Sequence, residues 1–203
     1  MPRKSTQRID GLRRSLADEA ARIMADQGVA DFLQAKRKAA ERLGIHDVAV
    51  LPRNVEIEAA LRERQRLFEA GSHALSLEAQ RSAALGAMRL LEGFQPRLVG
   101  PVLTGTATAH NHIQLHLFAD RSETVAMRLL DARVAYTMHE HRIKMDALRT
   151  VNYPALRFET QGRAVDATVF PIDGIRQSPY SPVDGRPMRR ADAREVSALL
   201  TRG

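Results

Sequence analysis

The chain has 203 residues, a net charge of +7 and no cysteine. With 44% hydrophobic and 27% charged residues, it has the composition of a soluble globular protein of one domain or two small ones. The lack of cysteine excludes disulfides, thiolate catalysis and cysteine-based zinc sites, and it favours the cytoplasm. We expect no membrane partner, because no apolar run approaches the roughly 18–20 residues that cross a bilayer and the N-terminus lacks the apolar stretch of a secretory signal.

The positive charge lies in the two flanks, residues 1–70 and 142–203, while the segment between them is neutral. A basic balance favours polyanionic partners, because cations that pair with phosphates release counterions. The clusters suited to nucleic-acid contact are Lys36, Arg37 and Lys38 in the first flank and Arg189 and Arg190 in the second. RNA, DNA or a nucleotide is therefore an expected partner, and solvated helix faces are the alternative interpretation.

Apolar residues at helical spacing predict four helices in the first ninety residues. We expect these helices over about residues 12–23, 30–43, 55–70 and 77–91, with stop signals at Gly28, Gly44 and Gly93. Asn54, which follows Pro52, is expected to cap the third of them. This helical half is also a candidate surface for a protein partner.

After residue 93 the pattern changes to short runs rich in apolar and β-branched residues, which are typical of strands. We expect strands at 97–103, 113–119, 134–141, 155–160 and 164–170, and a helix at 123–131 capped by Asp120 or Ser122. Gln161-Gly162-Arg163 predicts a hairpin turn. A Pro/Gly-rich stretch at 178–187 predicts an extended arm that packs on the surface or on a partner, and Asp192 with Glu195 predicts a capping box on a last helix.

These elements predict an α+β fold in three segments. Residues 1–93 form a helical domain, residues 94–175 form a small mixed sheet with helices, and residues 176–203 form a Pro-rich arm with a short C-terminal helix.

One motif is the most informative part of the chain: residues 100–115 read GPVLTGTATAHNHIQL. A glycine opens a turn, Gly105-Thr106-Ala107 follows, and His112 and Gln114 stand one residue apart on a predicted strand. Alternate strand residues point to the same side, so His112 and Gln114 are expected to share a face.

Over about residues 97–170 this pattern resembles the minimal nucleotidyltransferase domains related to DNA polymerase beta. In that family a Gly-Ser turn cradles a triphosphate, an Asp-x-Asp pair holds two metal ions, and a later strand supplies a third carboxylate. The resemblance implies nucleotide contacts at Gly100, Gly105, Thr106 and Gln114, and catalytic roles for Asp166, as the third carboxylate, and for His112. The magnesium or manganese of the family is the cofactor implied if the chain is catalytic, with zinc a lesser alternative.

The chain departs from the family pattern at three positions. Pro101 stands in place of the serine and removes a hydroxyl and a backbone donor together. His112 and Gln114 stand in place of the aspartates, and neither offers the anionic oxygen that magnesium prefers. We therefore expect a degenerate, non-catalytic protein that binds a nucleotide, nucleic acid or protein. The alternatives are an active nucleotidyltransferase with an unorthodox metal site and a structural interaction module.

Five of the seven histidines lie close together in the sequence, at positions 110, 112, 116, 139 and 141. His112 and His116 are predicted to share a strand face with Gln114, and His139 and His141 to share a face on their own strand. If the strands are neighbours, imidazoles converge with Asp166 in a site for zinc, manganese or nickel, with His112, His116 and Asp166 as the candidate ligands. Alternatively, His112 acts as a general base, or the histidines only line a half-exposed face.

Overall fold

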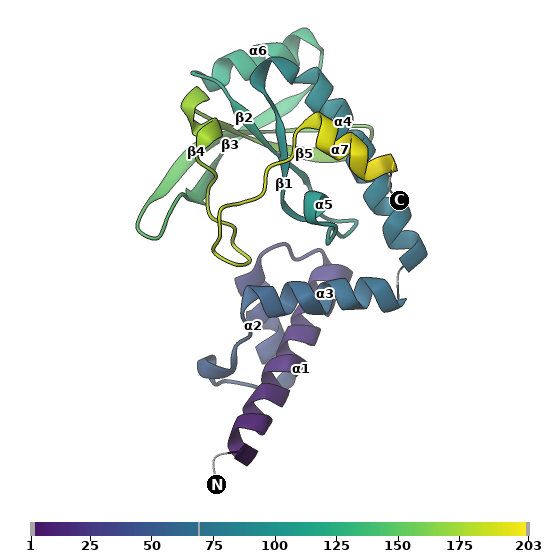
Figure 1. The fold of residues 1–203 in the computed structure, drawn as a ribbon, viewed down its shortest axis with the longest axis vertical. Helices are drawn as coiled ribbons and strands as arrows, with labels where there is room; N and C mark the ends of the chain where they lie inside the picture. The colour runs from purple at the N-terminus through teal and green to yellow at the C-terminus, as the bar shows by residue number, and fades with distance from the viewer. Residues whose placement is uncertain (1–2, 69, 202–203) are drawn as a thin grey trace. The chain divides into compact units, whose positions relative to one another are not determined.

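The computed structural model describes residues 3–68 and 70–201, and the chain divides into two compact units. The first unit comprises residues 1–73 with two short later segments, 106–111 and 182–184, and the second comprises the rest. Figure 1 shows the helices of the first unit in purple and blue and the strands of the second in teal and green. Among the described helices, none combines the length and the apolar character needed for a bilayer crossing.

The first unit is helical, as the apolar spacing predicts. Its elements are α1 (Arg3–Gln27), α2 (Phe32–Leu43), the 3-10 turn η1 (Val48–Val50) and α3 (Asn54–Phe68). Asp31 caps α2 by accepting a hydrogen bond from the Gln34 amide, and Gly44 ends the helix with φ 63°. Asn54 is the first residue of α3 and its side chain donates to the Pro182 carbonyl, so the expected cap at this position is replaced by a contact distant in sequence.

A small ion cluster joins α1 to α2 in this unit. The Glu19 carboxylate, whose side chain is 15% exposed, accepts hydrogen bonds from Arg22 at 2.8 Å and from Arg42 at 3.0 Å. The hydrogen bond from Arg22 is the largest effect on the pKa of Glu19, and with Arg42 it outweighs burial and lowers that pKa to about 2. Because ionised Glu19 is favoured in the folded chain, its contribution to stability is full above its ordinary pKa near 4.5 and is lost as the pH falls toward 2.

Glu19→Gln is therefore expected to lower the free energy of unfolding by about 1–2 kcal/mol at pH 7, as for a hydrogen bond to a charged group. The difference from the native chain should shrink between pH 4.5 and pH 2, and urea unfolding across this range measures it. Glu41→Gln, on the exposed side of α2, is the matched control and should change stability by less than about 0.5 kcal/mol. A constant difference at all pH values would contradict the role of the ion cluster.

The second unit contains a mixed sheet with helices, which confirms the α+β class. The helix α4 (Ala70–Leu90) belongs to this unit from residue 74 onward. The other elements are η2 (Glu92–Phe94), β1 (Arg97–Val99), α5 (Gly100–Thr104), β2 (Ile113–Phe118), α6 (Ser122–Asp131), β3 (Tyr136–Lys144), β4 (Thr150–Thr160), β5 (Arg163–Phe170), η3 (Ile172–Arg176) and α7 (Ala193–Thr201).

The helical unit ends at His73 rather than at the expected residue 93, because the later part of α4 packs with the sheet. Gly86 lies against the Gln161 side chain in the β4–β5 turn. The Leu90 carbonyl accepts a hydrogen bond from Arg128 of α6.

The strand order is β1-β2-β5-β4-β3, with β2 parallel to β5 and the other pairs antiparallel. Because neighbouring strands are in register, side chains form rows across the sheet. One row runs through Val99, Gln114, Asp166, Arg157 and Thr137. The next row runs through Arg97, His116, Thr168, Ala155 and His139.

The two faces of the sheet differ in chemistry. The face opposite the two rows described above carries fully buried apolar residues, among them Leu98, Ile113, Leu115, Leu117, Leu156, Val165 and Ala167. Buried side chains of α4 and α6, such as Met88 and Leu129, add to the core of this unit. The face with the two rows above carries the polar residues, and it holds the candidate site.

The expected strand at 97–103 is wrong in its second half, because the chain turns into the short helix α5 after Val99. Gly100 has φ +70°, in the left-handed region that glycine adopts without strain, and Pro101 suits the first turn of a helix. Gly105, at φ +86°, ends α5.

Two further expectations concern local structure after β2. Neither Asp120 nor Ser122 caps α6: the cap position is Arg121, without a side-chain hydrogen bond. The stretch expected to be an extended arm instead closes on itself, because the Ser181 amide donates to the Arg186 carbonyl at 2.7 Å and the Met188 amide to the Pro179 carbonyl at 2.7 Å.

The capping box before α7 is confirmed. The Asp192 amide donates to the Glu195 carboxylate at 3.0 Å, and the Glu195 amide donates to the Asp192 carboxylate at 2.9 Å.

Candidate metal centre

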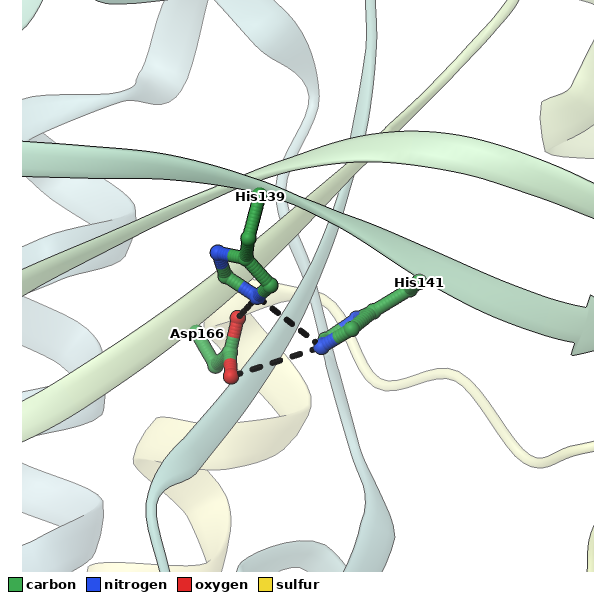
Figure 2. A group of neighbouring side chains, drawn as sticks. All are labelled: His139, His141 and Asp166. Carbon is green, nitrogen blue, oxygen red and sulfur yellow. Dashed lines mark hydrogen bonds and ion pairs between the residues drawn. The ribbon is translucent and has the colours of Figure 1, made fainter.

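Two histidines of β3 and an aspartate of β5 meet over the strand that separates them. His139 and His141 stand on the polar face of β3, and Asp166 stands on the same face of β5 (Figure 2). On β4, between them, the residue opposite His139 is the fully buried Ala155. Its small side chain leaves room for the imidazoles to reach across a strand toward Asp166.

The donor atoms of these three residues lie close together. His139 Nε2 is 3.0 Å from Asp166 Oδ1, His141 Nε2 is 3.4 Å from Asp166 Oδ2, and the two Nε2 atoms are 3.1 Å apart. Ligands at 2.0–2.1 Å from a tetrahedral zinc ion are about 3.3–3.4 Å from one another. The three side chains thus need little movement to bind one ion.

Asp166 has a buried oxygen that lacks a hydrogen bond. Its side chain is 7% exposed, and Oδ1 has no hydrogen-bond partner, although His139 Nε2 lies 3.0 Å from it in an ion-pair contact. The other oxygen, Oδ2, accepts a hydrogen bond from Arg157 at 2.8 Å. A buried carboxylate oxygen left unpaired is costly, and a cation at Oδ1 removes that cost.

His141 is oriented by a second contact. Its Nδ1 lies 2.8 Å from the hydroxyl oxygen of Thr168, a buried residue of β5. With an ion bound, Nδ1 would carry the proton and donate it to Thr168, so that the Nε2 lone pair faces the ion in place of its contact with Asp166. Metal-binding histidines are commonly fixed in this way through their other ring nitrogen.

The pKa of Asp166 is lowered, although burial alone would raise it. The hydrogen bonds with His141 and Arg157, followed by the charges of His141 and His139, outweigh the cost of burial. Asp166 is therefore ionised at neutral pH and supplies the negative charge that a cation requires.

The donor set decides which metals fit. The magnesium pair of the nucleotidyltransferase family needs several anionic oxygens, whereas the group consists of two imidazoles and one carboxylate. Two nitrogens and one oxygen suit a single zinc, manganese, nickel or iron ion, and three protein ligands leave a coordination position open. The two-magnesium arrangement does not fit these residues.

Of the predicted metal ligands, Asp166 and His112 lie together and His116 does not join them. His112 Nδ1 is 3.9 Å from Asp166 Oδ2, with its side chain 40% exposed, so it stands at the rim of the group. His116 Nδ1 instead accepts a hydrogen bond from Arg190 Nε at 3.0 Å, and its ring packs on Phe170. Burial and then the nearby charge of Arg190 lower the pKa of His116 well below its ordinary value, so it is a neutral residue of the interior.

The predicted nucleotide-binding residues are divided between the two units: Gly100, Gly105 and Gln114 belong to the second and Thr106 to the first. Gln114 pairs in register with Asp166, and its side chain lies directly against the Cα of Gly100, where an added Cβ would overlap it. Gly105 ends α5. Thr106 belongs to the first unit, where it is buried and its hydroxyl donates to Glu58 at 3.2 Å.

The predicted nucleic-acid contacts also change. Lys36 and Lys38 are half-buried and only Arg37 of that cluster is exposed, because successive residues point to different sides of a helix. Arg189 is exposed. Arg190 donates to His116 and to the carbonyls of Gly174, Ile175 and Gln177, so its role is to hold the segment after β5.

Arg190→Gln is expected to destabilise the chain by about 2–4 kcal/mol, because the buried His116 ring and three backbone carbonyls lose a charged donor. Arg189→Gln is the matched control and should change stability by less than about 0.5 kcal/mol. Thermal unfolding of the two variants measures the difference. Equal stability would show that the Arg190 contacts contribute little.

Four residues of the site are not among the predicted ligands and contacts. His139 and His141 were recognised only as a pair on one face, and Arg157 and Thr168 had no signal of their own. The sequence signal for His139 and His141 is that they stand one residue apart on a strand and so share a face. The contacts of Arg157 and Thr168 depend on how β3, β4 and β5 pair, which the sequence does not reveal.

Comparisons of the chain with protein-family models, with curated proteins and with solved structures find no match. The function is therefore inferred from the geometry of the site itself.

Proposed function

We propose that this chain is a metal-dependent nucleotide-binding protein. His139, His141 and Asp166 hold one divalent transition-metal ion, and the ion's open position takes a phosphate oxygen of the nucleotide. The observation that carries the proposal is the convergence of three donor atoms, one from each side chain, within 4.8 Å of one another, together with a buried Asp166 Oδ1 that has no hydrogen-bond partner.

The sheet supports the nucleotide part of the proposal. Gly100 redirects the chain after β1, and Gln114 of β2 lies beside Asp166 of β5 on one face. This is the arrangement that the resemblance to minimal nucleotidyltransferases implies for the first ligand strand and the third carboxylate. The loss of the aspartate pair, together with Pro101 in the turn, favours binding over transfer. The absence of cysteine favours the cytoplasm as its location.

The test is nucleotide binding to protein loaded with one equivalent of zinc or manganese and then freed of excess metal. Calorimetry with ATP, GTP, CTP and UTP should show binding to the loaded protein that weakens at least about tenfold after chelation. Equal affinity with and without metal would contradict the proposal. Asp166→Asn should likewise lose the metal-dependent binding. Asp173→Asn, which removes an exposed carboxylate of η3, is its control for a general loss of negative charge.

Active nucleotidyl transfer is the second candidate, and the open coordination position favours it. In that reaction an acceptor hydroxyl oxygen bonds to the α-phosphorus, the bond to pyrophosphate breaks, and the hydroxyl proton passes to His112. The bound ion would offset charge on the phosphates. Labelled nucleoside triphosphates incubated with the loaded protein and total RNA would give label transfer that disappears in Asp166→Ala. Transfer of this kind would overturn the non-catalytic assignment.

A further inference from the structure

A hollow of about 560 Å³ lies at the start of β3. It lies entirely within the second unit and is lined by residues from the α6–β3 connection, the end of β4 and the start of β5. Thr137 and Arg157, which line it, stand in the same row of side chains as Asp166. These two residues therefore connect the hollow to the row that contains Asp166.

Arg157 connects the two. Its guanidinium donates to Asp166 Oδ2 at 2.8 Å, and its side chain remains 46% exposed. Among the described residues Asp166 is its one hydrogen-bond partner, and a guanidinium carries five N–H donors. Arg157 can thus hold Asp166 in place and still offer donors to a ligand in the hollow.

The charge of the hollow favours an anion. The charged residues in its lining are Arg133, Arg157 and Glu159, which give a net charge of one positive unit. Arg133 is exposed and makes no side-chain hydrogen bond or ion pair with any described residue. The Thr137 hydroxyl adds a neutral donor. Two arginines with unused donors are a common means of binding phosphate groups, because their planar forks match phosphate oxygens.

The turn where the family resemblance places phosphates is less suited to them here. The Gln114 side chain lies against Gly100, and Pro101 lacks an amide hydrogen.

We propose that the hollow lined by Arg133 and Arg157 binds the phosphate groups of the ligand, next to the metal held by His139, His141 and Asp166. This inference rests on the proposed function for its nucleotide, but the anion site itself does not need the metal. The shared chemistry is a di- or triphosphate, free or attached to a nucleoside.

The test is calorimetric titration of sodium pyrophosphate, and separately of ATP, into zinc-loaded and metal-free protein. Arg133→Gln and Arg157→Gln should each weaken pyrophosphate binding about tenfold or more, the loss expected for one charge-assisted interaction. Glu159→Gln removes the opposing charge and should tighten binding about two- to fivefold. Arg142→Gln, an exposed arginine elsewhere on β3, is the matched control and should leave the affinity unchanged.

The outcomes separate this proposal from the metal site. Arg133→Gln should leave zinc affinity unchanged, whereas Arg157→Gln should also weaken zinc binding because Asp166 loses its orienting contact. If ATP binding alone responds to the arginines, the source of the phosphates is a nucleotide. If neither anion responds to Arg133→Gln and Arg157→Gln while zinc still binds, the hollow is not the phosphate site. If the arginines matter and zinc does not bind, the phosphate site stands and the metal proposal fails.

Discussion

Asp166→Asn is expected to weaken zinc binding by at least about 100-fold. The substitution keeps the shape of the side chain but removes the negative charge of a carboxylate whose two oxygens lie 3.0 Å from His139 Nε2 and 3.4 Å from His141 Nε2. Loss of an orienting contact behind a ligand typically costs 10–100-fold in metal affinity, so loss of the ligand itself should cost at least as much. Competition with a chromophoric chelator measures the affinity.

The histidines give a graded version of the same result. His139→Ala and His141→Ala should each lose zinc to a similar degree, because both Nε2 atoms face Asp166. His112→Ala should have a smaller effect, since its nearest ring nitrogen is 3.9 Å from the carboxylate. Asp173→Asn is the matched carboxylate control. Native zinc affinity in a folded Asp166→Asn variant would contradict the site, and circular dichroism establishes that the variant is folded.

Gly100→Ala is expected to lower the free energy of unfolding by about 2–4 kcal/mol. An alanine at φ +70° adopts the left-handed conformation at a cost of roughly 1–2 kcal/mol, and its Cβ would overlap the Gln114 side chain, as in an overpacked core. Chemical unfolding measures the change.

A double-mutant cycle separates these two effects. In a Gln114→Ala background the overlap is removed, so Gly100→Ala should cost only the backbone strain of roughly 1–2 kcal/mol. An equal cost in both backgrounds would show that Gln114 does not pack on the glycine. Gly71, with nothing near its Cα and no positive φ, is the matched position, where alanine should be neutral or mildly stabilising.

The local parts of the fold follow closely from sequence patterns. Helical periodicity and the signals at Asp31, Gly44 and the Asp192–Glu195 pair act within one or two turns, so they are readable from neighbouring residues. The short helix α5 is an exception. Its apolar and β-branched composition matches a strand, and only the left-handed turn at Gly100 redirects the chain.

The site is harder to predict because it depends on pairing between distant strands. The motif places Gln114 beside Asp166 only if β2 pairs with β5, and His139 reaches Asp166 only because β4 inserts the small Ala155 between them. The same dependence explains His116. Because strand side chains alternate, His116 lies on the same face as Gln114. Arg190, which is distant in the sequence, donates a hydrogen bond to its ring and makes His116 part of the interior.

The charge patterns show the same limit. Arg189 and Arg190 are equivalent in the sequence, yet one is exposed and the other donates to three carbonyls. Thr106 is part of the motif, yet its hydroxyl binds Glu58 in the helical unit. A residue's chemistry is set by the side chains it meets, and these come from segments that no local pattern connects.

The most direct test of the metal site is elemental analysis of the full chain, purified without a histidine tag and dialysed against metal-free buffer after loading with zinc, manganese or nickel. The geometry predicts about one bound ion per chain, lost in Asp166→Asn and retained in Asp173→Asn. Substoichiometric metal under all three conditions would contradict the proposal that His139, His141 and Asp166 form a metal centre.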